Sequence, residues 1–470
     1  MRQDIKQYFV LLIIGLFMAG ICFGMCPGNV SAEPECALIV EPLLPGENRT
    51  FEVVQPIRMR SIAGWETASF SAGQTKTIVE DAADALVSAQ NATDKGWVFN
   101  LDTGTTTADN IYGAVGLGLL RAYNMTKSKS GVDIEASNPN YLTAAGDVAD
   151  KIREGGFSLQ ATDYIFLKYY AEVIGDANYS NYGDTVLNAV IIDTNTPAEV
   201  AAWLDTIDDD QGKLWQLANW VEVFQLYGDA SYADAVVTKI LDYDATAGTG
   251  SDMVRGFVYD MSNKYVRTLD QARVVEVLKR YYSTTHATEI AQGLALLKDL
   301  QYNNGYFRWA CQLNVNDVTL FPSVMVQDQA CALKAMAFNA QTTFDNYDNH
   351  LGVFWGANAL MEMQDLGGGF TTDKQTINIS EYNAEALDAL HSSCREGDVD
   401  RSGKVMPWDA LNTLKAAVGM IDLDGPALLA ADRNGDGAIT AMDALKILQS
   451  SVGKDIAVTV GDSISDSDTL

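Results

Sequence analysis

The chain has 470 residues, of which 47% are hydrophobic, and this is enough apolar material for a large folded core. That composition excludes a chain disordered throughout and a small scaffold held only by disulfides. The 62 acidic residues outnumber the 32 basic residues, and the net charge of −30 repels phosphate backbones, so we expect no nucleic-acid partner.

The first 32 residues have the pattern of a secretory signal peptide. Arg2 and Lys6 precede an apolar run from Tyr8 to Phe23, and Val30-Ser31-Ala32 supplies small residues for cleavage. The alternative is an uncleaved membrane anchor, because the run is about long enough to span a bilayer. Cleavage after Ala32 predicts a secreted protein with no membrane contact.

Residues 33–75 are expected to form an irregular lead-in, and residues 76–394 contain an internal repeat of two helices. Amphipathic segments alternate with helix starts that carry an acidic or amide residue. The segments begin near Ile78, Tyr141, Ala198, Tyr232, Thr288 and Leu351. The helix starts recur every 53 to 58 residues, at Asp109, Asp163, Gln216, Asp270, Asp328 and Glu381. Six such repeats predict an all-α fold, an (α/α)6 toroid with an inner ring of helices wrapped by an outer ring.

A closed ring brings the starts of its inner helices to one end of a central cavity. Convergent carboxylates there can act as general acid and base on a glycosidic bond, or bind Ca²⁺ against an acidic sugar. The candidate catalytic residues are Asp109, Asp163, Asp270 and Asp328. The alternative is a structural role, because acids in the first helical turn stabilise the helix dipole.

Gly-aromatic pairs mark the turns between the two helices of a repeat. They are Gly96-Trp97, Gly156-Phe157, Gly256-Phe257, Gly305-Tyr306 and Gly369-Phe370. This pattern resembles the repeat of the terpenoid-cyclase-like α/α toroid superfamily, which includes polysaccharide lyases. The alternative is a helix that ends at Gly and is followed by an aromatic plug.

Two stretches also resemble family-10 pectate lyases. Gly96-Trp97 to Asn100, with Asp109-Asn110, is similar to that family's Gly-Gly-Trp…Asp-Asn passage. Trp309-Ala-Cys311-Gln312, with Thr319 to Pro322, is similar to its Trp-Cys-x-Gln…Thr-x-x-Pro passage. The arginine that serves that family as base is replaced after the proline by Ser323-Val324, which leaves Arg273 or Arg308 as substitutes.

Aromatic and polar side chains near the same rim are the candidate substrate-binding residues, since aromatic rings can stack on sugars. They are Trp97, Asn110, Tyr306, Arg308, Trp309 and Glu381.

Four cysteines remain after signal cleavage, and an even number permits two disulfides in an exported protein. Ring closure would bring Cys36 to Cys394, while Cys311 and Cys331 flank a turn of the fifth repeat. We therefore expect these two pairs, with buried free thiols as the alternative because the cysteine density is low.

Two twelve-residue loops near the C-terminus, residues 398–409 and 432–443, have the spacing of calcium ligands. Oxygen-bearing side chains stand at loop positions 1, 3, 5 and 12, Gly stands at position 6, and position 7 offers its carbonyl. The predicted ligands of two Ca²⁺ ions are Asp398, Asp400, Ser402, Lys404 and Asp409 in the first loop, and Asp432, Asn434, Asp436, Ala438 and Asp443 in the second.

Each loop runs into an apolar helix and closes with Asp where an ordinary EF-hand has Glu. The duplicated unit resembles a type I-like dockerin over residues 396–453, and an acidic tail, residues 454–470, follows it. The resemblance implies calcium-folded helices that bind a cohesin module of a scaffold or surface protein. Pro407-Trp408 and Ala441-Met442 replace the small hydroxylated pair common at positions 10 and 11, which implies a different cohesin type.

These features together predict a secreted carbohydrate-active protein, a polysaccharide lyase or glycoside hydrolase, held at a scaffold or cell surface through cohesin. The alternative is a non-catalytic binding toroid in the same kind of assembly.

Overall fold

The computed structural model describes the toroid segment and most of the C-terminal segment. The described residues are 70, 72–91, 93, 95–101, 107–126, 139–155, 158–193, 195–206, 213–248, 253–259, 261–314, 318–340, 347–365, 367–371, 379–393, 397–400, 405–421, 423, 425–433 and 438–452. The chain divides into two units, residues 1–62 and 63–470, and all described residues belong to the second. The predicted signal peptide, most of the lead-in and the acidic tail lie outside them.

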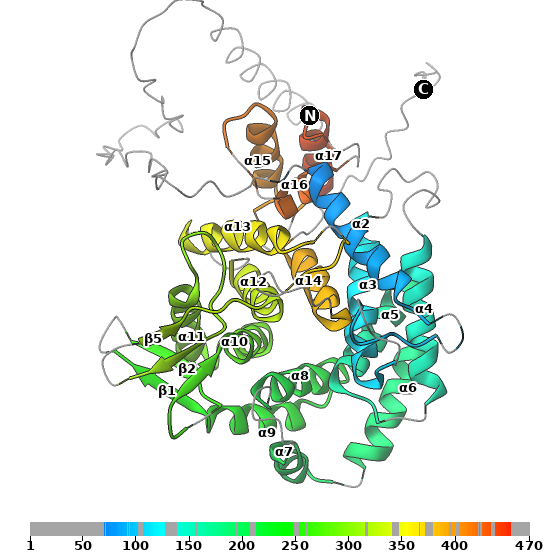
Figure 1. Cartoon of the computed structure of the whole chain (residues 1–470), viewed down its shortest axis with the longest axis vertical. Coiled ribbons are helices and arrows are strands. Elements are labelled where there is room, and N and C mark those ends of the chain that lie inside the picture. The colour runs from blue at the N-terminus through cyan, green and yellow to red at the C-terminus, as the bar shows by residue number, and fades with distance from the viewer. Residues whose placement is uncertain are drawn as a thin grey trace, which may run out of the picture. The chain divides into compact units, whose positions relative to one another are not determined.

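Six helices form the inner ring. They are α3 (Tyr112–Thr126), α5 (Ala161–Ile174), α8 (Lys213–Leu226), α10 (Thr268–Tyr282), α12 (Val326–Ala340) and α14 (Ser380–Ser392). Each packs against the next, and α14 packs against α3, which closes the ring (Figure 1). Glycine allows the close contacts of α3, because a Cβ on Gly113 would lie 2.2 Å from the Thr162 carbonyl carbon. A Cβ on Gly118 would likewise lie 2.5 Å from Cα of Ala384 on α14. The predicted all-α toroid is confirmed.

The outer helices each precede an inner helix. They are α2 (Ala72–Ser88), α4 (Pro139–Glu154), α7 (Pro197–Asp205), α9 (Ala230–Leu241), α11 (Ala287–Leu300) and α13 (Tyr347–Glu362). A further helix, α6 (Asn178–Leu187), continues as the π-helix η2 (Asn188–Ile192) and was not predicted. The short 3-10 helix η1 (Asp109–Ile111) leads into α3.

Local sequence explains where several helices begin and end. Thr196 caps α7, because its Oγ1 accepts from the Glu199 N–H at 3.3 Å while Glu199 Oε2 accepts from the Thr196 N–H at 2.7 Å. Pro197 occupies the first turn of that helix, where its missing N–H costs nothing. Helix α5 ends at Gly175, whose φ of +70° is the left-handed conformation that glycine adopts freely.

Two small antiparallel sheets lie in the connections around α10 and α11. Strands β1 (Asp244–Ala247) and β2 (Val254–Phe257) form one, and β3 (Tyr265–Arg267), β4 (Ala310–Leu313) and β5 (Val318–Phe321) form the other in the order β3-β4-β5. In β4, Cys311 pairs with Val266 on one side and with Leu320 on the other.

The structure corrects one disulfide prediction. Cys311 is a free, buried thiol in β4, and Cys331 is a free thiol on inner helix α12. Strand pairing holds Cys311 in its sheet, whereas Cys331 lines the interior of the ring. The Cys311–Cys331 pair is therefore wrong, and the alternative of free thiols holds for these two residues. Cys394 and Cys36 lie outside the described residues.

Three of the Gly-aromatic turns are plugs of the hydrophobic core, since Trp97, Phe257 and Phe370 are fully buried. Tyr306 is half-buried, and Gly156-Phe157 lies outside the described residues. Amide side chains of the inner helices hold these turns in place. Phe257 and Phe307 donate their backbone N–H to the Oε1 atoms of Gln271 and Gln329, at 2.9 and 2.8 Å. This repeated contact supports the structural interpretation of the turns.

The C-terminal segment contains α15 (Pro407–Ala417), α16 (Gly425–Ala431) and α17 (Ala441–Ser451). Helices α15 and α17 pack together around a small core of Val399, Ala410, Ala431 and Ile447. Val405 and Ile439, which are position 8 of the two loops, pack against that core. Helix α16 also contacts α2, with Leu429 and Ala430 joining the large core.

Within the described part of the chain, no helix is both long enough and apolar enough to cross a membrane.

Candidate functional site

Asp163, at the start of α5, is bonded to the backbone of the ring itself. Its Oδ1 accepts from the Gly113 N–H in the first turn of α3 at 2.7 Å, and its Oδ2 accepts from the Gln160 N–H at 2.7 Å. The side chain therefore caps its own helix and at the same time ties that helix to the preceding inner helix.

The same contact recurs at two other inner helices. Asp270 of α10 accepts from the Trp215 N–H of α8, and Asp328 of α12 accepts from the Leu269 N–H of α10, both at 2.8 Å. All three aspartates are fully buried. Burial raises the pKa of Asp163 to about 7, although two backbone N–H groups oppose the shift. Burial likewise raises the pKa of Asp328 to about 7 against the nearby Arg267. This geometry supports the capping alternative for these three residues.

Asp109, the fourth candidate catalytic residue, differs from the other three in its exposure and its contacts. It is exposed on η1, and its Oδ1 accepts from the Tyr112 hydroxyl at 3.3 Å.

A cavity of about 220 Å³ lies at the end of the ring where the inner helices begin. Each inner repeat contributes a wall residue, and these are Asn110, Thr162, Gln216, Leu269, Gln327 and Glu381. In four repeats the wall residue is the immediate neighbour of the predicted aspartate. Consecutive residues of a helix point about 100° apart around its axis. The aspartate and its neighbour therefore point in different directions, and the neighbour is the one that faces the cavity.

A second cavity, of about 80 Å³, lies deeper in the ring and shares Thr162, Trp215 and Asn219 with the first. Charged side chains dominate the described part of its wall. They are Arg121, Glu222, Arg273, Glu276, Arg280, Lys334, Glu385 and Asp388. Four cations thus face four acids inside a protein whose net charge is −30.

Arg273 of α10 is the centre of this network. Its guanidinium donates to Asn219 Oδ1 and to Glu276 Oε2, both at 2.7 Å, and also to Glu222 Oε2. Arg280 donates to Glu222 Oε1 at 2.8 Å and to Glu276 Oε1 at 2.7 Å. Burial opposes ionisation of Glu222, but Arg280 and Arg273 outweigh it and hold the pKa of Glu222 below its ordinary value.

Lys334 and Arg121 neutralise Asp388 in the same way. Lys334 Nζ lies 2.6 Å from Asp388 Oδ2, and Arg121 Nε lies 2.9 Å from Oδ1. Burial opposes ionisation here too, but the two cations hold the pKa of Asp388 below its ordinary value. These acids are therefore charged partners with no proton to donate at neutral pH.

Glu381 and Glu385 differ from the paired acids of the lumen. They stand one turn apart on α14, Glu381 in the wall of the outer cavity and Glu385 in that of the deeper one. Gln327 Nε2 donates to Glu385 Oε1 at 3.2 Å. Burial raises the pKa of Glu381 to about 7. Burial and the Glu381 carboxylate raise the pKa of Glu385 well above its ordinary value. Burial and the Glu381 carboxylate therefore both favour the protonated form of Glu385.

Two of the six candidate substrate-binding residues line the lumen, and the other four lie outside its two cavities. Asn110 and Glu381 line the outer cavity. Trp97 is fully buried, and its Nε1 donates to the Leu86 carbonyl at 2.8 Å, so this indole belongs to the core.

The other three candidates engage side chains outside the two lumen cavities. The Tyr306 hydroxyl donates to Glu362 Oε2 at 3.1 Å. The Arg308 guanidinium lies 3.7 Å from the ring centre of Tyr302. Trp309 packs against Phe321.

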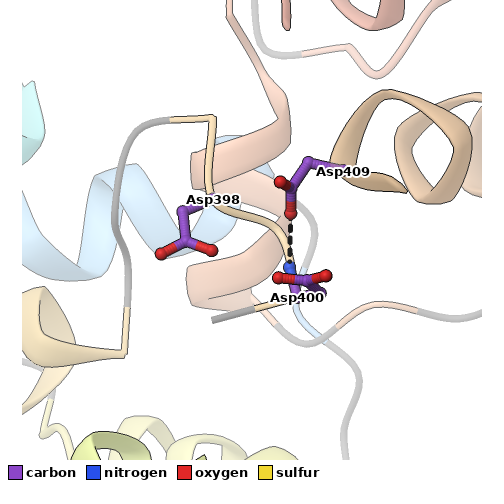
Figure 2. Close-up of side chains that lie close together, drawn as sticks. All are labelled: Asp398, Asp400 and Asp409. Atoms are coloured by element: carbon purple, nitrogen blue, oxygen red, sulfur yellow. Dashed lines mark hydrogen bonds between the residues drawn. The ribbon is translucent and has the colours of Figure 1, made fainter. Parts of the chain in front are cut away.

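The first C-terminal loop gathers carboxylates at one point (Figure 2). Ligand oxygens of Asp398, Asp400 and Asp409 all lie within 4.8 Å of one another. Asp409 accepts from the Asp400 N–H at 2.9 Å and from the Met406 N–H at 2.7 Å. Burial, followed by the charges of Asp400 and Asp398, raises the pKa of Asp409 to about 7. Such a set of oxygens suits a hard divalent cation. Ser402 and Lys404 lie outside the described residues.

The second loop repeats part of this arrangement. Asp443 is fully buried at the start of α17, and its Oδ2 accepts from the Thr440 N–H at 2.9 Å. At the start of α15, Asp409 Oδ2 accepts from the Met406 N–H, which is also three residues earlier in the chain. Asp432 is buried and Ala438 is exposed. Asn434 and Asp436 lie outside the described residues.

Sequence reasoning missed Glu385 and most of the charged lumen. The available signal was the spacing of charged residues along inner helices that are otherwise apolar. Glu381, Glu385 and Asp388 recur at helical spacing on α14, and Arg273, Glu276 and Arg280 do so on α10. Charges on one face of a buried helix indicate a polar interior.

No family model matches the sequence, and no curated protein matches it. Several solved structures are similar in fold. A possible member of the GH105 family from Salmonella enterica is 11% identical, with a TM-score of 0.45 over 72% of this chain and 98% of that chain. Cellobiose 2-epimerase from Bacillus thermoamylovorans is 11% identical, with a TM-score of 0.49 over 68% and 98%. Unsaturated glucuronyl hydrolase from Streptococcus agalactiae is 11% identical, with a TM-score of 0.46 over 72% and 97%. At these identities the similarity concerns the fold alone.

Proposed function

We propose that the ring lumen hydrolyses a glycosidic bond of a polysaccharide, with Glu385 as general acid and Glu381 as general base. The observation that carries the proposal is the different surroundings of two carboxyl groups one turn apart on α14, with Glu381 in the wall of the outer cavity and Glu385 beside Gln327 in the wall of the deeper one. Enzymes obtain an acid and a base from two carboxyl groups by giving them different environments.

In this reaction Glu385 gives its proton to the glycosidic oxygen as the bond to the sugar breaks, and Glu381 takes a proton from the attacking water. Hydrolysis is favoured over β-elimination because the described lumen arginines are engaged by carboxylates. Arg273 bonds Glu222 and Glu276, which leaves it poorly placed to act as the base of a lyase.

A panel of polysaccharides tests the activity by measuring new reducing ends and, separately, unsaturated products. We expect reducing ends without unsaturation, and a loss of about 10²- to 10⁴-fold in turnover for Glu385→Gln. Asp109→Asn is the matched control, because this exposed acid lies outside both lumen cavities. Unsaturated products, or full activity in Glu385→Gln, would contradict the proposal.

A non-catalytic binding toroid is the second candidate. Its support is the deeper cavity, which is only about 80 Å³ and whose described ions largely neutralise one another. Retained oligosaccharide binding with no bond cleavage on any substrate would favour this alternative.

We further propose that residues 396–453 are a dockerin that folds around two Ca²⁺ ions and binds a cohesin module. The three converging carboxylates of the first loop and the equivalent bonds of Asp409 and Asp443 support the proposal. Trp408 and Met442, 55% and 47% exposed, occupy the same position on α15 and α17 and offer an apolar contact to a partner.

Calorimetric titration with cohesin modules of several types, with Ca²⁺ and with chelator, tests this attachment. We expect calcium-dependent binding that is abolished when Asp398 and Asp432 are both replaced by Ala. Binding that persists in chelator would contradict it. Export through cleavage after Ala32 is part of the same proposal, and N-terminal sequencing of the secreted protein checks it.

A further inference from the structure

A third cavity, of about 600 Å³, lies outside the ring lumen. Residues of the α4–α5 loop, α5, α6, η2, α7 and α8 line its wall. The volume is in the range of small-molecule binding sites, which is roughly 300–1,000 Å³. Neither the hydrolytic residues nor the calcium loops extend into it.

Aromatic rings form one side of this cavity. Trp220 is buried, and its ring centre lies 5.6 Å from that of Tyr164 and 6.0 Å from that of Trp203. Trp203 meets Trp220 edge to face and is 48% exposed. A large indole that stays half exposed at a cavity is placed to cover a flat ligand face.

Another part of the wall is a helix with unusual geometry. Helix α6 widens at Asn188–Ile192 into the π-helix η2, and Val190 on that segment is 66% exposed. π-Helical turns are rare and occur frequently at functional sites. The distortion places Val190 and Ile191 in the cavity wall.

The chemistry of the wall restricts the ligand. No charged side chain is among the described residues that line the cavity, although the chain carries 94 charged side chains, 62 acidic and 32 basic. Ser158, Tyr182 and Asn195 add hydroxyl and amide groups to the apolar and aromatic surface. The Tyr182 hydroxyl also donates to the Ile152 carbonyl at 3.4 Å, and Asn195 Nδ2 donates to the Ile191 carbonyl at 2.8 Å. Aromatic faces with a few neutral polar groups fit an uncharged sugar ring better than a uronate or a fatty acid.

The cavity also neighbours the lumen mouth. Trp220 lines both this cavity and the outer lumen cavity, and the segment Ser158–Leu159 of one wall continues into Gln160–Ala161 of the other. A chain bound at the lumen mouth therefore has a second aromatic pocket beside it. We infer that the cavity beneath Trp203 is a distal binding subsite for a neutral sugar residue of an oligosaccharide. The inference rests on the proposed function for the identity of the substrate as a polysaccharide.

Isothermal titration of the full chain in a Glu385→Gln background tests the subsite without turnover. The probes are cellohexaose, xylohexaose and mannohexaose as neutral oligosaccharides, with tetragalacturonate and dodecanoate as charged and apolar competitors. We expect at least one neutral hexaose to bind, and Trp203→Ala to weaken it about tenfold. Trp203→Phe should keep most of the affinity because it keeps a ring, and Met261→Ala, which removes an exposed apolar side chain outside the cavity, should bind as the parent does.

Three results would overturn the inference: no hexaose binds the parent, Trp203→Ala binds equally well, or tetragalacturonate or dodecanoate binds in preference to every hexaose. Failure of the hydrolytic proposal is seen separately, as Glu385→Gln protein that still cleaves the substrate. In that case the subsite is still tested by comparing the hexaose affinity with and without Trp203→Ala.

Discussion

Two regions of this molecule carry regularly spaced acids, and their spacing has different consequences. In the loop of residues 398–409, three aspartates bring oxygens within 4.8 Å of one another. In the ring, Asp163, Asp270 and Asp328 are spaced just as regularly, yet each carboxylate bonds the backbone of a neighbouring helix.

The difference is that the ligand geometry of the loop is set by neighbouring residues in the chain, whereas the side-chain geometry of the ring is set by the packing of separate helices. A twelve-residue loop with Gly at its sharp turn places its ligands by local backbone geometry alone. Side chains in a ring of helices depend on the rotation of each helix, and one residue changes the direction by about 100°. Regular spacing therefore identifies the rim of the ring but not the residues that face its lumen.

The largest expected effect separates the lumen acids from the rim acids. Glu381→Gln should reduce turnover about 10²- to 10⁴-fold, because the variant has no base to accept the proton of water. In the parent the rate should rise with pH through about 7 as Glu381 ionises. Asp328→Asn should leave turnover within about threefold. If steady-state assays show a greater loss of turnover for Asp328→Asn than for Glu381→Gln, the catalytic residues are the aspartates at the helix starts and not the lumen glutamates.

The second prediction concerns the ion pairs that fill the lumen. Arg273→Met removes the more buried of the two arginines that bond both Glu222 and Glu276, so the free energy of unfolding should fall by about 3–5 kcal/mol. Arg153→Ala removes an exposed partner of Asp150 and should cost less than about 1 kcal/mol. Urea denaturation compares the two variants, and equal losses would show that the lumen network contributes no more than a surface pair.

The third prediction tests the loops. Calorimetry should find two tight Ca²⁺ ions in the parent and one in Asp398→Ala, with Asp242→Ala as an exposed-acid control. Removing Ca²⁺ that was present at a hundredfold excess over Kd should lower the stability of the C-terminal segment by about 2.7 kcal/mol for each bound ion. An unchanged stoichiometry in Asp398→Ala would break the link between loop spacing and metal binding.

The smallest effect is a change in the pH dependence of stability. The pKa of Asp328 is about 7 in the folded protein and ordinarily 3.8, so between these values the folded chain holds a proton that the unfolded chain has released. Its contribution to stability is therefore present below pH 3.8 and is lost as pH rises to 7. The slope is about 1.4 kcal/mol per pH unit for one group.

Asp328→Asn should flatten this slope by that amount in urea denaturation at pH 5, 6 and 7, whereas Asp242→Asn should not change it. An Asp328→Asn slope as steep as that of the parent would show that Asp328 is ionised in the folded ring.

The sequence by itself determined the helical repeat and the two acidic loops, since both follow from short-range patterns. Apolar periodicity located the outer helices, the recurring acidic or amide residues located the starts of the inner helices, and the spacing of Asp398, Asp400 and Asp409 placed three carboxylates in one loop. The tertiary structure alone decided which side chains enter the lumen. Helix rotation directed Asp328 to the backbone of α10 and Gln327 into the cavity, and the burial of α14 inside the closed ring raised the pKa of Glu385. Desolvation of that kind depends on the helices packed against α14, which are α3, α12 and α2, and no local pattern in the chain encodes their approach.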